Sequence, residues 1–493
     1  MTEEFTPRPE PQEPGAAAGG RGRAAGRVLA GIGRAGLAIA AVVLLAAGGW
    51  AVSAWYPGVL ADLSRTASSV VPDAVESTRV CATGLRTGGS MTSLDAGTAT
   101  GAGDLAASSA TTVTVQRLGQ QAGQVQGAAD GVFVGGLDDA TIVRTGDADA
   151  EGGLAGVSAQ RVDAGQVRGT LLTGCVSPGF DRWIGGGAQQ TGRSTSVRLV
   201  NPSDLEATVT LTAYTGQGQL AAGAEDLTVP AGGERVLPLS ALTTTDQALF
   251  VHVTAVRAPV AVFLQQTTTR TLTPGGADVQ GPGAGPATSQ TIVGMSVQGA
   301  EARAQVSTEA GWEDTQPVLR LLAPEAGGTA TVHISGAAER DLTVPLAAGT
   351  VVDSPLGDLP DGDYRIDITA DVPVVAAARV TSGGRDDGDL TWLQSAEATS
   401  RVRVAVPDGA EATTLRVAGA AGGSVTVTVD GAERRLDLDD AGLASLPVSA
   451  RQVVVLTADD PVRVALTTTR GGGIAATALE SVQQGGAVDV LAR

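Results

Sequence analysis

The chain has 493 residues, of which 52 are acidic and 33 basic, and its formal net charge is −19. A chain of this length predicts about three domains. The negative charge excludes a protein that binds nucleic acid through a strongly basic surface. Two histidines and two cysteines supply few ligands for a conventional zinc site, which needs three or four Cys, His or acidic groups.

The amino-terminal region predicts a disordered tail followed by a membrane anchor. Residues 1–34 are polar and interrupted by proline and glycine, so they cannot bury enough apolar surface to fold alone. Residues 35–56 contain no charged side chain and are long enough for a transmembrane helix. Arginines up to Arg34 precede this segment, and aromatic residues suited to the membrane interface end it, namely Trp50, Trp55 and Tyr56. The amino terminus is therefore expected inside the cell, and the chain after residue 57 outside the membrane.

A cleaved signal peptide is the alternative interpretation of this segment. Residues 51–54 (AVSA) resemble a cleavage site flanked by small residues. A signal peptide normally has a shorter apolar stretch, so we favour a retained single-pass anchor in the cell membrane.

The two cysteines, Cys81 and Cys175, are expected to form a disulfide. Compartments outside the cytoplasm are oxidising, and two cysteines allow one intramolecular pairing. Closing a loop of this length stabilises the fold by about 4–5 kcal/mol in the chain-entropy model. The alternative is that both are small buried residues with free thiols.

Beyond residue 60 the sequence predicts an all-β region. Short runs of alternating Val, Thr and Leu are separated by Gly, Pro and Asp clusters, as in half-buried strands and their turns. A repeat supports this interpretation, because residues 253–262 (VTAVRAPVAV), 368–376 (ITADVPVVA) and 456–464 (LTADDPVRV) correspond. The spacing between the copies suits tandem immunoglobulin-like β-sandwiches of about 100 residues each.

These patterns divide the chain into eight segments. Residues 75–192 lack the repeat but contain strand-like runs, and Gly/Pro-rich residues 273–285 are typical of a linker. Residues 286–312 do not match the repeat and are assigned to the second sandwich. The predicted segments are a cytoplasmic tail (1–34), a transmembrane helix (35–56), a linker (57–74), a disulfide-closed β-rich domain (75–192), a first sandwich (193–272), a linker (273–285), a second sandwich (286–400) and a third sandwich (401–493).

Several short motifs resemble an uncharacterised family of membrane-anchored actinobacterial proteins, a domain of unknown function. They are residues 79–81 (RVC), 173–178 (TGCVSP), 183–187 (WIGGG), 191–194 (TGRS), 199–202 (LVNP) and 207–209 (ATV). The third repeat departs from this pattern at Ala418 and Gly419, where the first repeat has Asn201 and Pro202. The resemblance implies a cytoplasmic tail, one membrane helix and a large extracytoplasmic β region. It also implies a gene that lies among genes for envelope glycosyltransferases. It implies no activity, cofactor or catalytic residue.

A search for catalytic and metal-binding motifs identifies no site. Residues 31–36 match G-x-G-x-x-G but open the apolar segment instead of following a strand. His252 and His333 lie in strand alternations and are expected on strand surfaces. Acidic clusters around residues 358–367 and 386–389 are expected to be turns, with calcium binding as the alternative. We therefore predict no catalytic residue, no metal site and no cofactor.

The sequence favours a non-enzymatic, membrane-anchored scaffold or accessory protein of the cell envelope. Its expected partners are the membrane and an envelope protein, which could be a glycan-assembly enzyme, and nucleic acid is not among them. The alternative is a protein that binds cell-wall glycan, for which one of Trp183, Trp312 and Trp392 should be exposed in a groove. A hydrolase ranks third and requires a pocket with converging carboxylates of raised pKa.

Overall fold

The structure is a computed structural model, and it describes residues 68–70, 77–82, 84–88, 98–118, 126–128, 131–145, 153–220, 223–243, 248–481 and 488–490. The described residues fall into two parts, 68–70 with 488–490, and those between 77 and 481. In the first part, β1 (Ser68–Val70) pairs antiparallel with β35 (Val488–Val490). The following paragraphs describe the second part, called the main part.

The predicted tail and the predicted transmembrane helix 35–56 lie outside the described residues. The same holds for the predicted membrane-interface residues, which are Arg34, Trp50, Trp55 and Tyr56. No helix in the described ranges is long and apolar enough to span a bilayer.

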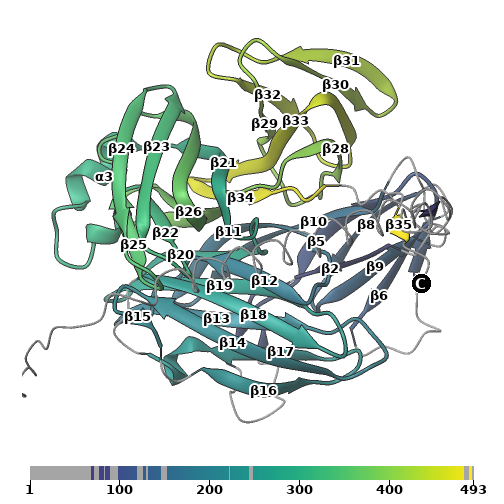
Figure 1. Cartoon of the computed structure of the whole chain (residues 1–493), viewed down its shortest axis with the longest axis horizontal. Coiled ribbons are helices and arrows are strands. Elements are labelled where there is room, and N and C mark those ends of the chain that lie inside the picture. Colours follow the sequence, from purple (N-terminus) through teal and green to yellow (C-terminus); the bar gives the residue numbers. More distant parts are fainter. Residues whose placement is uncertain are drawn as a thin grey trace, which may run out of the picture. The chain divides into compact units, whose positions relative to one another are not determined.

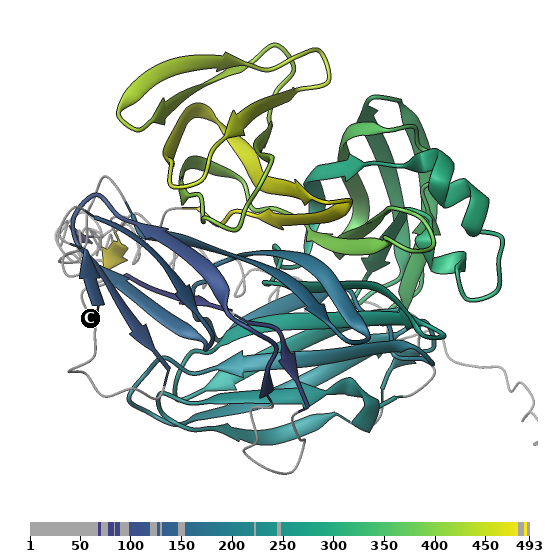
Figure 2. The same cartoon turned by 180° about the vertical axis from the view of Figure 1, so that it is seen from behind.

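The main part is mostly β and consists of four modules with one shared topology (Figures 1 and 2). Each module has eight strand positions in two antiparallel sheets. In the sheet that we call outer, the strands lie in the order first, sixth, third and fourth. In the sheet that we call inner, they lie in the order fifth, second, seventh and eighth. The all-β prediction for this region is therefore confirmed.

The modules are numbered along the chain. Module 1 (residues 78–174) contains β2 (Thr78–Cys81), β5 (Gly103–Ser108), β6 (Val113–Arg117), β7 (Gln126–Ala128), β8 (Val132–Leu137), β9 (Thr141–Thr145), β10 (Ala155–Ala164) and β11 (Val167–Gly174). A small additional sheet pairs β3 (Arg86–Thr87) with β4 (Thr98–Ala99). Module 2 (residues 181–280) contains β12 (Asp181–Gly185), β13 (Arg193–Val200), β14 (Ala207–Thr215), β15 (Gly218–Gln219), β16 (Ala224–Val229), β17 (Glu234–Pro238), η2 (Leu239–Ala241), β18 (Leu249–Val256), β19 (Ala261–Arg270) and β20 (Thr273–Gln280).

In modules 3 and 4 one long strand serves both sheets. Module 3 (residues 287–394) contains β21 (Ala287–Val297), α3 (Ala300–Val306), η3 (Glu313–Thr315), β22 (Val318–Leu322), β23 (Gly328–Gly336), β24 (Arg340–Leu346), β25 (Val351–Pro355), β26 (Gly362–Ser382) and β27 (Asp389–Gln394). Module 4 (residues 399–478) contains β28 (Thr399–Ala405), β29 (Thr413–Ala418), β30 (Ser424–Val429), β31 (Ala432–Asp437), β32 (Leu443–Val448), β33 (Val453–Arg470) and β34 (Gly473–Ala478).

The repeated proline of the sequence marks the place where the chain passes between the two sheets. Before Pro373, β26 pairs with β23 of the outer sheet, and after it β26 pairs with β22 of the inner sheet. Pro461 has the corresponding position in β33. In module 2 the strand breaks here into β18 and β19, with Arg257 at φ 73° shortly before Pro259. Proline is tolerated at this corner because regular ladder pairing is interrupted there.

The alternation of Val and Thr produces the expected one-sided burial. In β30 each Val of SVTVTV is buried, and the intervening residues are half-buried. The buried faces of the two sheets of module 2 form one core cluster, which includes Ile184, Val197, Leu211 and Leu264. Each module is therefore stabilised mainly by apolar surface buried between its own two sheets.

The eighth strands of the four modules meet along a common axis. β11 contacts β20, β20 contacts β27, β27 contacts β34, and β34 contacts β11. These are edge strands of four different sheets, and β11, β20 and β34 are labelled in Figure 1. The arrangement is like a β-propeller in which a two-sheet module takes the place of each blade.

Two expectations about segment boundaries require correction. Residues 273–285, which we predicted to be a linker, contain the axial strand β20. The region 75–192 was expected to be unrelated to the repeat, but its strands have the same order as those of the other modules. The disulfide between Cys81 and Cys175 is confirmed and joins the end of β2 to the residue after β11.

Candidate functional site

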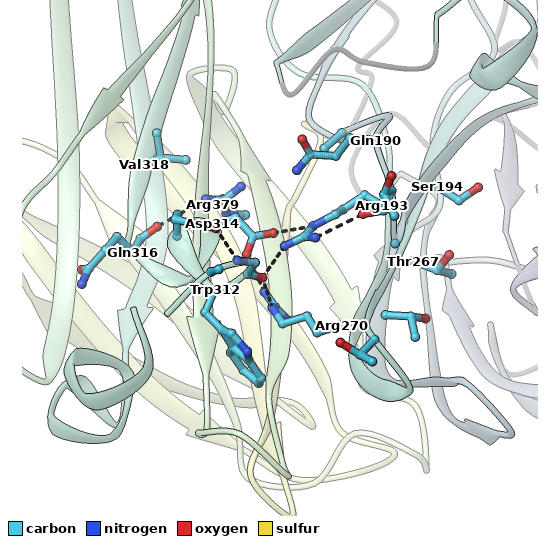
Figure 3. Close-up of a pocket in the computed structure, with 18 of the residues that line it drawn as sticks. Gln190, Arg193, Ser194, Thr267, Arg270, Trp312, Asp314, Gln316, Val318 and Arg379 are labelled. Atoms are coloured by element: carbon cyan, nitrogen blue, oxygen red, sulfur yellow. Dashed lines mark hydrogen bonds and ion pairs between the residues drawn. The ribbon is translucent and has the colours of Figure 1, made fainter. Parts of the chain in front are cut away.

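A polar cleft with a volume of about 1210 Å³ lies between modules 2 and 3. Figure 3 shows residues of both modules around it. The module 2 side comes mainly from the start of β13 and the end of β19, and the module 3 side from residues 310–318 with parts of β25 and β26. A cavity of this size accommodates a sugar or a short peptide segment.

An insertion in module 3 forms one wall of the cleft. Modules 2 and 4 connect their first and second strands through residues 186–192 and 406–412, whereas module 3 uses residues 298–317. This longer connection contains α3 and η3. Asp361 fixes its beginning, because its carboxylate accepts hydrogen bonds from the backbone N–H groups of Gly299 (3.1 Å) and Ala300 (2.8 Å). This non-repeated part of module 3 therefore lies at the cleft.

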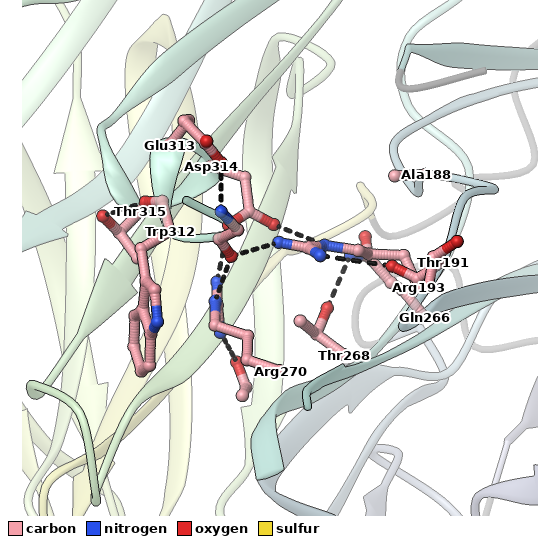
Figure 4. Close-up of polar contacts among 12 residues, drawn as sticks. Ala188, Thr191, Arg193, Gln266, Thr268, Arg270, Trp312, Glu313, Asp314 and Thr315 are labelled. Carbon is pink, nitrogen blue, oxygen red and sulfur yellow. Dashed lines mark hydrogen bonds and ion pairs between the residues drawn. The ribbon is translucent and has the colours of Figure 1, made fainter. Parts of the chain in front are cut away.

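Asp314 joins this insertion to module 2. Its two carboxylate oxygens accept hydrogen bonds from Arg193 Nε at 3.0 Å and from Arg270 Nη2 at 2.7 Å. The same arginines donate to the carbonyl oxygen of Gly311 at 2.7 and 3.2 Å. Figure 4 shows this network, which we call the Asp314 clamp. Because β13 and β19 are neighbours in the inner sheet, their arginines reach the same carboxylate.

The acidic groups of the cleft are held in the ionised form. Burial raises the pKa of Asp314, but the hydrogen bond from Arg193 and the charges of Arg379 and Arg270 outweigh it and hold the pKa at about 2. Burial likewise opposes ionisation of Asp353, and the charge and hydrogen bonds of Arg320 outweigh it and lower the pKa. These groups are carboxylates at neutral pH and have no proton to donate.

Arginines also pack against the tryptophans near the cleft. The guanidinium of Arg270 lies 4.6 Å from the centre of the Trp312 ring, and that of Arg385 lies 5.6 Å from it. Trp312 is only 7% exposed. In this position the Trp312 ring contributes cation–π contacts to the wall and offers little surface to a ligand.

A second group of acidic residues lies on the axis of the four modules. The carboxylate of Asp389 accepts backbone N–H groups from all four axial strands, at 2.8 Å from Thr170, 2.9 Å from Leu390, 3.3 Å from Ile474 and 3.4 Å from Ala277. The neighbouring cavity, of about 60 Å³, is too small for a sugar. This carboxyl therefore satisfies edge-strand N–H groups that would otherwise be buried without partners.

Asp278 has a similar role on the axis. Its carboxylate accepts hydrogen bonds from the backbone N–H of Trp392 at 2.8 Å and from Gln280 Nε2 at 3.0 Å. Burial raises the pKa of Asp278 and that of Asp389 to about 7, although the hydrogen bonds to each carboxylate oppose the shift. A hydrolase is expected to contain carboxyl groups with raised pKa values, but these two carboxyl groups are buried where the modules meet and hydrogen-bond to strands of neighbouring modules.

The predicted candidate residues are dispersed in the structure. His252 stacks on Trp183 with ring centres 3.9 Å apart and lies 3.1 Å from Asp181, and His333 pairs with Asp341 in another module. Within the described ranges, no group of three or more His, Cys, Asp or Glu residues is arranged to hold a metal ion. Neither histidine lines the cleft.

None of the three tryptophans has the exposed position that the glycan-binding alternative was expected to require. Trp183, Trp312 and Trp392 are 8%, 7% and 0% exposed. Trp183 and Trp392 belong to a core cluster formed by modules 2 and 3. The sequence did not identify the clamp residues as a site, although Arg193 lies within the TGRS motif quoted above and Asp314 follows the segment that could not be matched to the repeat.

Comparisons with known proteins place the chain in a family. The model of one family of unknown function matches residues 135–457, which include the cleft, all of modules 2 and 3, and parts of modules 1 and 4. The chain belongs to this family, DUF5719. The match confirms the expected resemblance to an uncharacterised family. A search of curated proteins gives no match for this DUF5719 chain.

Among solved structures, two adhesins align with this DUF5719 chain at low similarity. One is described as a Ca²⁺-stabilized adhesin that helps an Antarctic bacterium reach out and bind ice; it has 14% identity and a TM-score of 0.11, and the alignment covers 78% of this chain and 94% of that one. The other is a 1.5-MDa bacterial ice-binding adhesin with 15% identity and a TM-score of 0.10, covering 62% and 99%. At these TM-scores neither structure supports an argument about fold or function.

Proposed function

We propose that this chain is a non-enzymatic scaffold or accessory protein of the cell envelope. In this proposal, residues 35–56 anchor it in the membrane with the amino terminus in the cytoplasm, and the modules are extracytoplasmic immunoglobulin-like sandwiches of an actinobacterial protein. The cleft between modules 2 and 3 then receives part of an envelope protein, such as a membrane-embedded glycan-assembly enzyme.

The observation that carries the proposal is the chemistry of the cleft. Its walls are joined by the Asp314 clamp, and the carboxylates of Asp314 and Asp353 are kept ionised by arginines. A general acid or base works best with a pKa near the operating pH. A cleft with fixed walls and strongly ionised carboxylates is suited to binding a partner more than to proton transfer.

The position of the cleft supports the same interpretation. A repeated frame provides rigid support, and binding residues commonly lie on the loops that such a frame holds in place. Here the longest connection between the first two strands in modules 2 to 4 belongs to module 3, and it lines the cleft.

Glycan binding is the second candidate function, for one specific reason. Most of the uncharged polar side chains that line the cleft carry hydroxyl or amide groups, and these can hydrogen-bond to sugar hydroxyls. The buried tryptophans provide no stacking surface for a sugar ring, so this candidate depends on hydrogen bonding and charge.

In-cell crosslinking tests the proposal. The full-length chain with a carboxy-terminal tag is crosslinked in the producing cells, and the membrane and wall fractions are analysed by mass spectrometry. Recovery of one membrane protein in about stoichiometric amount supports the accessory role. Recovery with wall polymer alone contradicts that role and favours glycan binding, and recovery of the chain without any partner contradicts both.

A further inference from the structure

The charges around the cleft do not cancel completely. Its lining contains three arginines, Arg193, Arg270 and Arg379, and three acids. However, Asp353 is already paired with a further arginine behind the wall, Arg320, whose Nε and Nη2 donate to it at 2.7 and 2.8 Å. The local balance is therefore one positive charge in a chain whose formal net charge is −19.

Arg379 is the arginine of this group without an ion-pair partner among the described residues. Its side chain extends from β26, where Arg379 lies opposite Val318 on one neighbouring strand and Trp392 on the other. Its one hydrogen bond within the described part of the chain is a long one, from Nη2 to the carbonyl oxygen of Gln316 at 3.4 Å. Nε is buried and has no hydrogen-bond partner. Figure 3 shows Arg379 behind Asp314 at the cleft.

Arg379 packs over the Trp392 ring at 5.5 Å but has no ion-pair partner among the described residues, and its burial makes this significant. The residue is 7% exposed, and burial lowers its pKa while the charges of Asp314 and Asp353 oppose this shift. An arginine nevertheless stays protonated in proteins, so the group is a buried cation with unused donors. A buried charge is costly unless it is paired and hydrogen-bonded. An anion entering the cleft would supply both the countercharge and the acceptors.

The remaining lining indicates what should carry the anionic group. The edge of a guanidinium formed by Nη1 and Nη2 matches the two oxygens of a carboxylate. In Arg379, Nη1 donates to no described residue, and Nη2 donates only to the carbonyl oxygen of Gln316 at 3.4 Å. Around it are hydroxyl and amide side chains, which suit a ligand rich in hydroxyl groups, and these are Gln166, Gln190, Thr191, Ser194, Thr267 and Thr271.

We propose that the cleft contains an anion-binding site centred on Arg379, whose ligand is a carboxylated sugar of the uronic-acid type. The guanidinium of Arg379 binds the carboxylate, and the hydroxyl and amide side chains bind the sugar hydroxyls. This inference rests on the second candidate function, glycan binding in the same cleft, and names its ligand class; it does not depend on the scaffold role, because an accessory protein needs no sugar site.

Calorimetric titration of the purified full-length chain in detergent tests the proposal. The probes are D-glucuronate, its neutral counterpart glucose, inorganic phosphate, and a short glutamate peptide. We expect glucuronate to bind and glucose to bind at least about tenfold more weakly, since a charge-assisted pair is worth about 1.5–3 kcal/mol. The Arg379→Gln variant should weaken glucuronate binding by a similar factor.

Two further variants separate loss of the site from loss of the fold. Arg379→Lys keeps the charge without the planar fork and should retain part of the affinity. Arg463→Gln is the matched control, because Arg463 is also partly buried with an unpartnered Nε but lies in module 4 outside the cleft. Its glucuronate affinity should equal that of the unmodified chain.

Three results would overturn the proposal. They are absence of glucuronate binding to the unmodified chain, equal affinity for phosphate or the glutamate peptide, and equal loss of affinity in the Arg379→Gln and Arg463→Gln variants. If Arg379→Gln does not fold, the comparison of glucuronate with glucose on the unmodified chain decides the question. Crosslinking to a protein partner is measured separately, so failure here leaves the scaffold proposal intact.

Discussion

Replacing Asp314 by asparagine removes the charge that joins the module 3 insertion to module 2. The carboxylate lies between Arg193 and Arg270, whose side chains are 7% and 4% exposed. Asparagine has nearly the same shape but presents one amide group to two guanidinium donors. Both arginines would then remain buried without the negative charge that now pairs with them. Arg270 would be held less firmly, and its cation–π contact with Trp312 would weaken.

The magnitude follows from two independent estimates. The pKa of Asp314 falls from 3.8 to about 2 in the folded state, which corresponds to about 2 kcal/mol of stability at neutral pH. Removing one partner of a buried ion pair costs about 3–5 kcal/mol. Because the amide oxygen of asparagine still accepts one hydrogen bond, we expect the free energy of unfolding to decrease by about 2–4 kcal/mol.

Urea unfolding followed by tryptophan fluorescence measures this change. Glu313→Gln is the matched control, since it makes the same chemical change at the adjacent, exposed position. Equal unfolding free energies for Asp314→Asn and Glu313→Gln would refute the assignment of the clamp.

The pH dependence provides a second check on the same residue. The folded pKa of Asp314 is lower than the unfolded value, so its contribution to stability is present above about pH 4 and is lost as the pH falls toward 2. Stability measured over this range should fall less steeply with decreasing pH in the Asp314→Asn variant. Parallel pH profiles for the variant and the unmodified chain would contradict the expected shift.

Three further predictions concern the frame. Replacing Cys81 or Cys175 by serine should lower the free energy of unfolding by about 2–5 kcal/mol in urea without reductant, and unchanged stability would show that the disulfide contributes nothing. Because Asp278 and Asp389 have folded pKa values of about 7, above the unfolded value of 3.8, their contribution to stability is present below about pH 4 and lost as the pH rises to about 7. Urea unfolding across this range should give a smaller slope for Asp278→Asn, and an unchanged slope would be evidence against the shift. Glu480→Gln weakens the contact between the end of module 4 and a buried arginine of β2, so hydrogen exchange should increase in β34, and unchanged exchange there would contradict this role.

The β character of the frame could be predicted from sequence, because alternating Val and Thr gives one-sided burial. The number of modules could not, since module 1 has Gly- and Ala-rich strands such as β5 (GDLAAS) without that alternation. The axial strand β20 was mistaken for a linker for a related reason. A Cβ on Gly276 would lie 2.7 Å from the backbone nitrogen of Leu390, so close packing of edge strands requires glycine where sequence rules predict a loop.

The cleft could not be predicted because its residues come together only through the tertiary fold. Arg193 and Asp314 are 121 positions apart, and Arg270 and Asp314 are 44 apart. The one useful indication in the sequence was that the segment before Trp312 did not match the repeat. A segment that departs from a repeated frame is a sensible place to search for a site. The disulfide was predictable because two cysteines allow a single pairing within the chain.

Site-directed photo-crosslinking in cells tests the central claim most directly, namely that the cleft between modules 2 and 3 is the binding surface. A photoreactive residue replaces Ser194, which is exposed and lines the cleft, or Glu433, which is exposed on β31 of module 4. The account predicts that the Ser194 position captures one envelope protein and that the Glu433 position does not. Capture of the same protein from both positions, or from the Glu433 position alone, would contradict it.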